Sequence, residues 1–166
     1  MFEMQNTKEI PLLRVNAHVF KHSKFGCTHL HLDCDSTEKA FSVAFRTIPK
    51  DHSGIAHILE HTVLCGSEKF PVRDPFFMMT RRSLSTFMNA MTYPDITAYP
   101  FATLNDKDFS NLLSVYLDAA FFPNIDELDF MQEGHRFELI MDGDKEKLAL
   151  KGVVYNEMKG AMSSVP

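Results

Sequence analysis

The sequence has no tryptophan, only three cysteines and no long apolar run. Cys27, Cys34 and Cys65 are odd in number and show no CxxC spacing. This pattern argues against a disulfide framework or a cysteine-rich zinc site, and it favours a reducing compartment. No apolar segment approaches the roughly 20 residues that span a bilayer, so we expect no membrane partner. Residues 1–13 lack the basic and apolar regions of a secretory signal, and none is predicted.

Basic residues are also too few for a typical nucleic-acid-binding protein. Lys and Arg total 17 against 22 for Asp and Glu, which gives a formal net charge of -5. Nucleic-acid-binding proteins usually carry a basic stripe, so we expect no nucleic-acid partner. The remaining composition is globular, with 45% hydrophobic and 23% charged residues in a chain of 166. A chain of this length and composition can form one compact unit with a substantial core.

The hydrophobic pattern groups the chain into blocks of strands and helices. It predicts strands over residues 15–20, 28–32, 40–48, 85–91, 96–103 and 148–154. It predicts helices over residues 53–66, 74–82, 105–122, 126–136 and from 155 to 163. Ser53 and Asn105 are expected as N-caps, and the first helix should carry one apolar stripe, formed by Ile55, Ile58, Leu59 and Thr62. Because strands and helices do not alternate regularly, we predict an α+β fold with an antiparallel sheet and helices on one side.

The pentapeptide His57-Ile58-Leu59-Glu60-His61 carries the chemistry. On a helix, His57, Glu60 and His61 fall within about 100° of arc, so both imidazoles can reach one ion while the carboxylate lies beside them. HxxEH is a known zinc-peptidase pattern. A zinc ion lowers the pKa of water bound to it to about 7, and an unligated carboxylate nearby can then take the proton. The pattern therefore predicts a metal site with Glu60 as general base.

Two alternatives remain open at this point. The pentapeptide arises by chance in a chain of this composition with a probability of ~0.02, and two histidines on an amphipathic helix are sometimes a surface pair. A surface pair is less favoured because both histidines border apolar residues. Burying half of each imidazole beside a carboxylate costs free energy unless a metal or another partner compensates. A third ligand is also required. Spacing does not choose it among Glu133, Glu138 and Glu157.

Several longer segments resemble a known family. They are GIAHILEHTVLCGSEKFPVRDPFF, SLSTFMNAMTYPDITAYPF, FMQEGHRFEL and GVVYNEMKGAM. Together they closely resemble the pitrilysin/insulinase family of metallopeptidases, within its presequence-protease and falcilysin branch. The similarity runs from about Phe41 to the C-terminus, and the order of the segments makes it more specific than the pentapeptide.

The resemblance implies a fold and a set of site residues. The expected fold is the first, metal-bearing domain of a pitrilysin-type peptidase. One Zn²⁺ per chain would be held by His57, His61 and Glu157, the last of these in NEMKG, with Glu60 as the general base. Glu133 and His135 would contact the ligand side chains and orient them without binding the ion.

The family also holds the substrate backbone on an edge strand beside the metal. The matching residues are Asn89 and Ala90, and an extended peptide added to such an edge gains hydrogen bonds whatever its sequence. A simpler reading is that Asn89 only begins the turn at TYPD. His29 and His31 share one face of a predicted strand, and we expect them to be ordinary strand residues.

The resemblance also implies what lies outside these residues. Family members have two halves that close around a short unfolded peptide, and residues 1–166 match a partial N-terminal zinc-peptidase domain. We therefore expect a zinc metalloendopeptidase fragment that acts on peptides such as cleaved targeting sequences, with the C-terminal half of the same protein as its partner. The alternative is a non-catalytic remnant that binds zinc or peptide. The expected location is the bacterial cytoplasm, with the mitochondrial matrix as the alternative.

Overall fold

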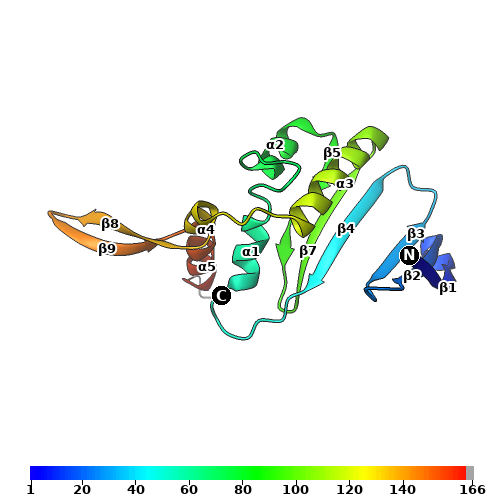
Figure 1. Ribbon diagram of the computed structural model, residues 1–166, viewed down its shortest axis with the longest axis horizontal. Helices are drawn as coiled ribbons and strands as arrows, with labels where there is room; N and C mark the ends of the chain where they lie inside the picture. The colour runs from blue at the N-terminus through cyan, green and yellow to red at the C-terminus, as the bar shows by residue number, and fades with distance from the viewer. Residues whose placement is uncertain (164–166) are drawn as a thin grey trace. The chain divides into compact units, whose positions relative to one another are not determined.

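The computed structural model describes residues 1–163, and the chain divides into two compact units, Met1–Thr37 and the part from Glu38 onward. The first unit is an antiparallel sheet in the order β1 (Phe2–Ile10), β2 (Val15–His22) and β3 (Thr28–Asp33), with a short 3-10 helix at Pro11–Leu13 (Figure 1). The sequence did not predict β1. Eight of its nine residues are exposed, so it has no buried face that hydrophobic alternation could mark.

The second unit is built around a four-stranded antiparallel sheet. Its strands are β4 (Lys39–Arg46), β5 (Ser85–Met88), β6 (Met91–Thr92) and β7 (Ile96–Thr103). Strand β7 lies in the middle, paired with β4 on one side and with β5 and then β6 on the other. The strand predicted over 85–91 is therefore two short strands, with a break at Asn89 and Ala90.

The core of this unit lies between the sheet and one long helix, α3 (Asp106–Phe121), which runs along the sheet (Figure 1). Phe101 from β7 packs against Leu112 and Tyr116 from α3, and these three side chains are at most 1% exposed. Burial of each such side chain stabilises the fold by about 1.5–3 kcal/mol. The helix begins where the sequence predicts, because the Asn105 side chain accepts a hydrogen bond from the backbone N–H of Asp108.

Four further α-helices and a hairpin complete the described part of the chain. They are α1 (Ile55–Thr62), α2 (Pro75–Arg82), α4 (Glu127–Glu133), the hairpin of β8 (Arg136–Asp142) and β9 (Lys145–Lys151), and α5 (Val153–Ser163). Helices α1, α4 and α5 lie side by side, and the hairpin leads away from α4 and α5 (Figure 1). The architecture is α+β with antiparallel sheets, as predicted. No helix in residues 1–163 is long and apolar enough to cross a membrane.

The first helix differs from its prediction in both its start and its buried face. Its N-cap is Gly54, at a φ of 72° that favours glycine, while Ser53 bonds to the Asp51 carboxylate. The helix ends at Thr62 instead of Gly66. Of the expected apolar stripe, Ile55 and Leu59 are 59% and 39% exposed, whereas Ile58 is half-buried and Thr62 is buried. The buried face is polar instead, because it points toward the site described below.

Two boundaries near the C-terminus were also predicted wrongly, for one reason. The helix predicted over 126–136 ends at Glu133, and the strand predicted over 148–154 gives way to α5 at Val153. Between them the backbones of Gly134 and Gly152 touch. A Cβ on Gly152 would lie 2.0 Å from the Gly134 carbonyl oxygen. This close crossing joins the base of the hairpin to both helices, and it depends on contacts that hydrophobic periodicity does not encode.

Candidate metal centre

His57 and His61 lie one turn apart on α1 and face the same way. Their ring centroids are 5.1 Å apart, and about a quarter of each side chain is exposed. The eight-residue helix has no interruption between them, so its period alone sets this spacing. The pair is therefore half-buried, as expected from its apolar neighbours.

Glu157 on α5 completes a group of three. Its Oε2 lies 3.6 Å from Nε2 of His57 and 3.6 Å from Nε2 of His61. All three candidate ligand atoms lie within 4.8 Å of one another. Ligand atoms about 2.0–2.2 Å from a tetrahedral zinc ion are roughly 3.4 Å apart, so a small contraction would fit the ion. Within residues 1–163, this is the one group of His, Cys, Asp and Glu with such spacing.

The other two carboxylates that spacing left open do not join this group. Glu138 lies on β8 and pairs with Arg136. Glu133, at the end of α4, contacts the opposite ring nitrogen of His61: its Oε2 lies 2.9 Å from Nδ1. A proton on Nδ1 donates to this carboxylate, which leaves the Nε2 lone pair directed at the ligand group. Glu133 is only 8% exposed, so this hydrogen bond is well shielded.

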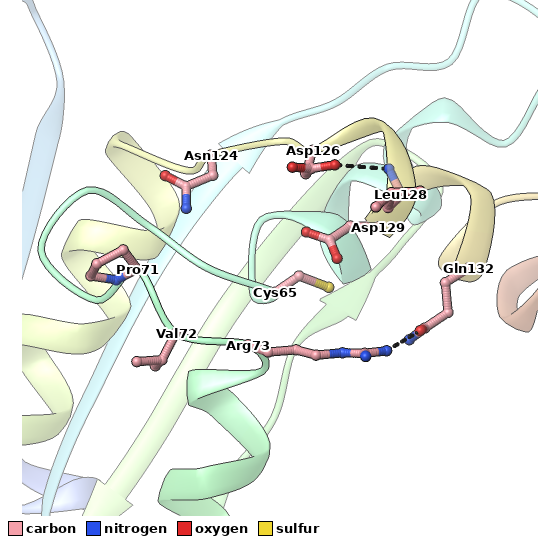
Figure 2. Close-up of a pocket in the computed structure, with 9 residues that line it drawn as sticks. All are labelled: Cys65, Pro71, Val72, Arg73, Asn124, Asp126, Leu128, Asp129 and Gln132. Carbon is pink, nitrogen blue, oxygen red and sulfur yellow. Dashed lines mark hydrogen bonds between the residues drawn. The ribbon is translucent and has the colours of Figure 1, made fainter.

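Glu133 is itself held by a short chain of hydrogen bonds. Gln132 Nε2 donates to Glu133 Oε1 at 2.8 Å, and Arg73 donates to Gln132 Oε1 at 2.5 Å. Figure 2 shows the Arg73 side chain extended toward Gln132. His135, the other residue expected behind the ligands, packs edge-on against the ring of Phe130.

Glu60 lies beside the group without being part of it. The side chain is 6% exposed, and its Oε2 accepts a hydrogen bond from the Thr92 hydroxyl at 2.5 Å. A distance this short is typical of a hydroxyl bonded to a charged carboxylate. The pKa of Tyr99 is raised, first by burial and then by the negative charge of Glu60. Both observations place the carboxylate in a largely dry part of the site.

A cavity of about 360 Å³ connects these residues with the edge of the sheet. The three grouped residues, Glu60 and Glu133 line it together with Asn89, Ala90, Leu64, Phe76 and Phe77. Asn89 lies at the break between β5 and β6, and the turn before β7 comes later, closed by the bond from Tyr93 N–H to the Ile96 carbonyl. Asn89 therefore does not begin that turn. The side-chain Oδ1 of Asn89 accepts a hydrogen bond from the Ala90 N–H at 3.0 Å, and the backbone carbonyl of Asn89 accepts one from the Tyr116 hydroxyl.

A second cavity, of about 320 Å³, also has Cys65 in its lining, and Figure 2 shows the residues around it. Arg73, Asp126, Asp129 and Gln132 also line it. Burial raises the pKa of the Cys65 thiol to about 12, and the charges of Asp129 and Glu133 add to the effect. At neutral pH the side chain is therefore a thiol, which is neither a good nucleophile nor a metal ligand.

The histidines of the first unit form no comparable group. His31 lies opposite His18 on β2, and their rings stack at 6.0 Å, whereas His29 lies opposite Phe20. These are ordinary cross-strand contacts.

Sequence reasoning missed Thr92, and local spacing did not indicate the contact between Glu133 and His61, although the resemblance had suggested Glu133 as a support for the ligands. Thr92 is 32 positions from Glu60, and Glu133 is 72 from His61. Neither spacing corresponds to a local period, and only the packing of α1 against β6 and α4 brings these side chains together.

Comparisons with known proteins identify the family of the chain. The family described as insulinase, peptidase family M16, matches residues 46–153. The mitochondrial presequence protease of Candida albicans is 56% identical over 165 residues, a match that covers 98% of this chain and 16% of the relative. The mitochondrial presequence protease of Mus musculus is 55% identical over 163 residues, with the same coverage. The chain thus spans about 16% of the length of these relatives.

A solved structure is similar in fold. The crystal structure of pitrilysin matches with a TM-score of 0.60 at 20% identity, over 76% of this chain and 14% of that one. At this identity the match concerns the fold alone.

Proposed function

This chain belongs to the insulinase family, peptidase family M16, and from that premise we propose that it carries the zinc site of a metalloendopeptidase that hydrolyses short unfolded peptides. The observation that carries the proposal is the convergence of His57, His61 and Glu157 within 4.8 Å, next to a buried carboxylate that is not one of the three. Peptidases of this family are metal-dependent, and zinc is the ion that two imidazoles and a carboxylate suit best.

In this proposal the three grouped side chains hold the ion. Zinc, when bound, polarises a peptide carbonyl and makes water more acidic. Glu133 keeps the His61 ring in the tautomer and orientation that present Nε2, through its bond to Nδ1. His57 and Glu157 complete the set from two helices that pack side by side.

Glu60 moves the proton. As the water oxygen attacks the carbonyl carbon, the Glu60 carboxylate accepts a proton from it, and the carboxylic acid then returns the proton to the nitrogen as the carbon–nitrogen bond breaks. Because Glu60 lies beside the three grouped residues without being one of them, its carboxylate suits the role of general base better than that of a ligand.

The open edge of the sheet beside the cavity supplies the substrate-binding surface. Strands β5 and β6 pair with β7 on one side only. An extended peptide can therefore add to their outer edge at Asn89 and Ala90, through backbone hydrogen bonds that do not depend on its sequence. The aromatic wall formed by Phe76 and Phe77 favours an apolar side chain next to the cleaved bond.

The relatives suggest the wider setting. Because they are named mitochondrial presequence proteases, we propose cleaved targeting sequences as substrates, and of the two expected locations these names favour the mitochondrial matrix. We further propose that residues 1–166 act as part of an N-terminal zinc-peptidase domain, with the remaining length of such a protein supplying the groups that enclose the peptide.

The test is chelator-sensitive cleavage of an unstructured peptide by the zinc-loaded chain and by two variants. Glu60→Gln should bind zinc normally and lose at least about 10³-fold in cleavage rate, because it cannot accept the proton. The matched control Glu68→Gln changes an exposed glutamate away from the site and should cleave normally. Zinc binding without cleavage by the unmodified chain would favour the non-catalytic remnant, and a Glu60→Gln variant that cleaves normally would refute the assigned base.

A further inference from the structure

The Glu60 carboxylate lies at the end of a row of three threonine hydroxyl groups on neighbouring strands of the sheet. We propose that Thr92, backed by Thr97 and Thr47, is a positioning residue that fixes the orientation of Glu60, an inference that rests on the proposed role of Glu60 as general base. Thr92 Oγ1 bonds to Glu60 Oε2 at 2.5 Å. Thr92 Oγ1 lies 3.5 Å from Thr97 Oγ1, which lies 2.7 Å from Thr47 Oγ1.

The direction of the hydrogen bond between Thr92 and Glu60 follows from counting hydrogens. A threonine hydroxyl has one hydrogen to donate, whereas an ionised carboxylate has none. Thr92 gives its hydrogen to Glu60, so in its contact with Thr97 it can act only as the acceptor. That contact is long, at 3.5 Å, whereas Thr97 and Thr47 lie 2.7 Å apart and either hydroxyl can donate to the other. Thr92 is therefore the donor that fixes the carboxylate, and Thr97 and Thr47 lie behind it.

The fold explains why these three residues meet. Thr92 on β6 lies directly opposite Thr97 on β7, and Thr47 follows the end of β4, on the other side of β7. Helix α1 packs against β6 and β7 and brings Glu60 to the end of this row. Threonine is suited to the position because its branched side chain is restricted in χ1 in a strand, so the hydroxyl points in a fixed direction.

Because Glu60 is buried, its carboxylate needs the hydrogen bond that Thr92 donates. Glu60 is 6% exposed and Thr97 only 2%. A carboxylate at such a depth needs a hydrogen-bond donor to remain charged without a large cost. With Oε2 engaged by Thr92, we assign proton transfer to Oε1. Thr92 thus selects the carboxylate oxygen that acts.

A double-mutant cycle tests the coupling without any catalysis. Unfolding is measured with chelator present, on the unmodified chain, Thr92→Val, Glu60→Leu and the double variant. Thr92→Val should lower Tm by roughly 5 °C, because it leaves a buried carboxylate without its donor. In the Glu60→Leu background the same change should cost less than about 1 °C. Thr92→Ser, which keeps the hydroxyl, should remain close to the unmodified chain.

A matched control separates this effect from the general cost of a threonine-to-valine change in a strand. Thr86 on β5 also donates to a carboxylate, that of Glu38, but both side chains are exposed. Thr86→Val should shift Tm by less than about 1 °C. Equal shifts for Thr92→Val with and without the Glu60 carboxylate would overturn the proposal. If Glu60→Leu fails to fold, Glu60→Met takes its place in the cycle.

Cleavage provides the second readout, and it separates positioning from a purely structural role. Thr92→Val should lower kcat about tenfold with KM unchanged, and Thr92→Ser should recover kcat to within about twofold. Coupling in the cycle together with an unchanged kcat would overturn the positioning role. If the unmodified chain cleaves nothing, the proposed function fails, while the thermal cycle still decides whether Thr92 holds Glu60.

Discussion

Replacing Glu133 with leucine should weaken zinc binding without unfolding the chain. The Glu133 carboxylate lies 2.9 Å from His61 Nδ1 and is 8% exposed, so its hydrogen bond is short and shielded from water. Without this bond the His61 ring can turn or adopt the other tautomer, and the Nε2 ligand is then present for only part of the time. Loss of such a supporting carboxylate typically costs 10–100-fold in metal affinity. The expected loss in binding free energy is therefore about 1.4–2.7 kcal/mol.

The assay is a competition titration of the metal-free chain against a chromophoric zinc chelator. Glu133→Gln keeps an acceptor for the imidazole N–H and should fall between Glu133→Leu and the unmodified chain. The control is Glu127→Leu, the same change at an exposed position in the first turn of the same helix, which should alter affinity by less than about twofold. Normal affinity in Glu133→Leu, with the fold confirmed by circular dichroism, would refute the reasoning. Equal losses at both positions would show that the helix, and not the carboxylate, matters.

Three further predictions concern stability. Leu112→Ala should lower the free energy of unfolding by about 3 kcal/mol in a urea titration, because it leaves a cavity at a fully buried position, and a loss below 1 kcal/mol would contradict the described core. Asn105→Ala should lower the free energy of unfolding by about 1 kcal/mol in the same assay, whereas Asn105→Asp, which keeps a capping oxygen, should lower it much less. Burial raises the pKa of Tyr116 above its ordinary value of 10, so the fold favours the neutral phenol. The contribution of Tyr116 to stability should therefore be constant below pH ~10 and be lost at higher pH, and Tyr116→Phe should make the fall of stability above pH ~10 shallower.

Local patterns predicted the parts of this chain that depend on local physics. The cap at Asn105, the strand from Lys39 to Arg46 and the imidazole pair on α1 each follow from periods or side-chain bonds within a few residues. The exposed strand Phe2–Ile10 has no buried face and gave no signal.

What the sequence left open depends on contacts between distant segments. Spacing alone did not choose Glu157 over Glu133, and only the resemblance to a family did so. The packing of α1 against α4 and α5 separates the two: one carboxylate lies near both Nε2 atoms, and the other near Nδ1. The polar face of α1 has the same origin, because Glu60 is buried where a local pattern predicts that a charged residue is exposed.

The most direct test of this account is the zinc content of the folded chain after loading and exhaustive dialysis. The account predicts one zinc ion per chain, and an ion content near zero for the folded double variant His57→Ala/His61→Ala. A folded, unmodified chain that retains no zinc, or a double variant that retains a full equivalent, would contradict it.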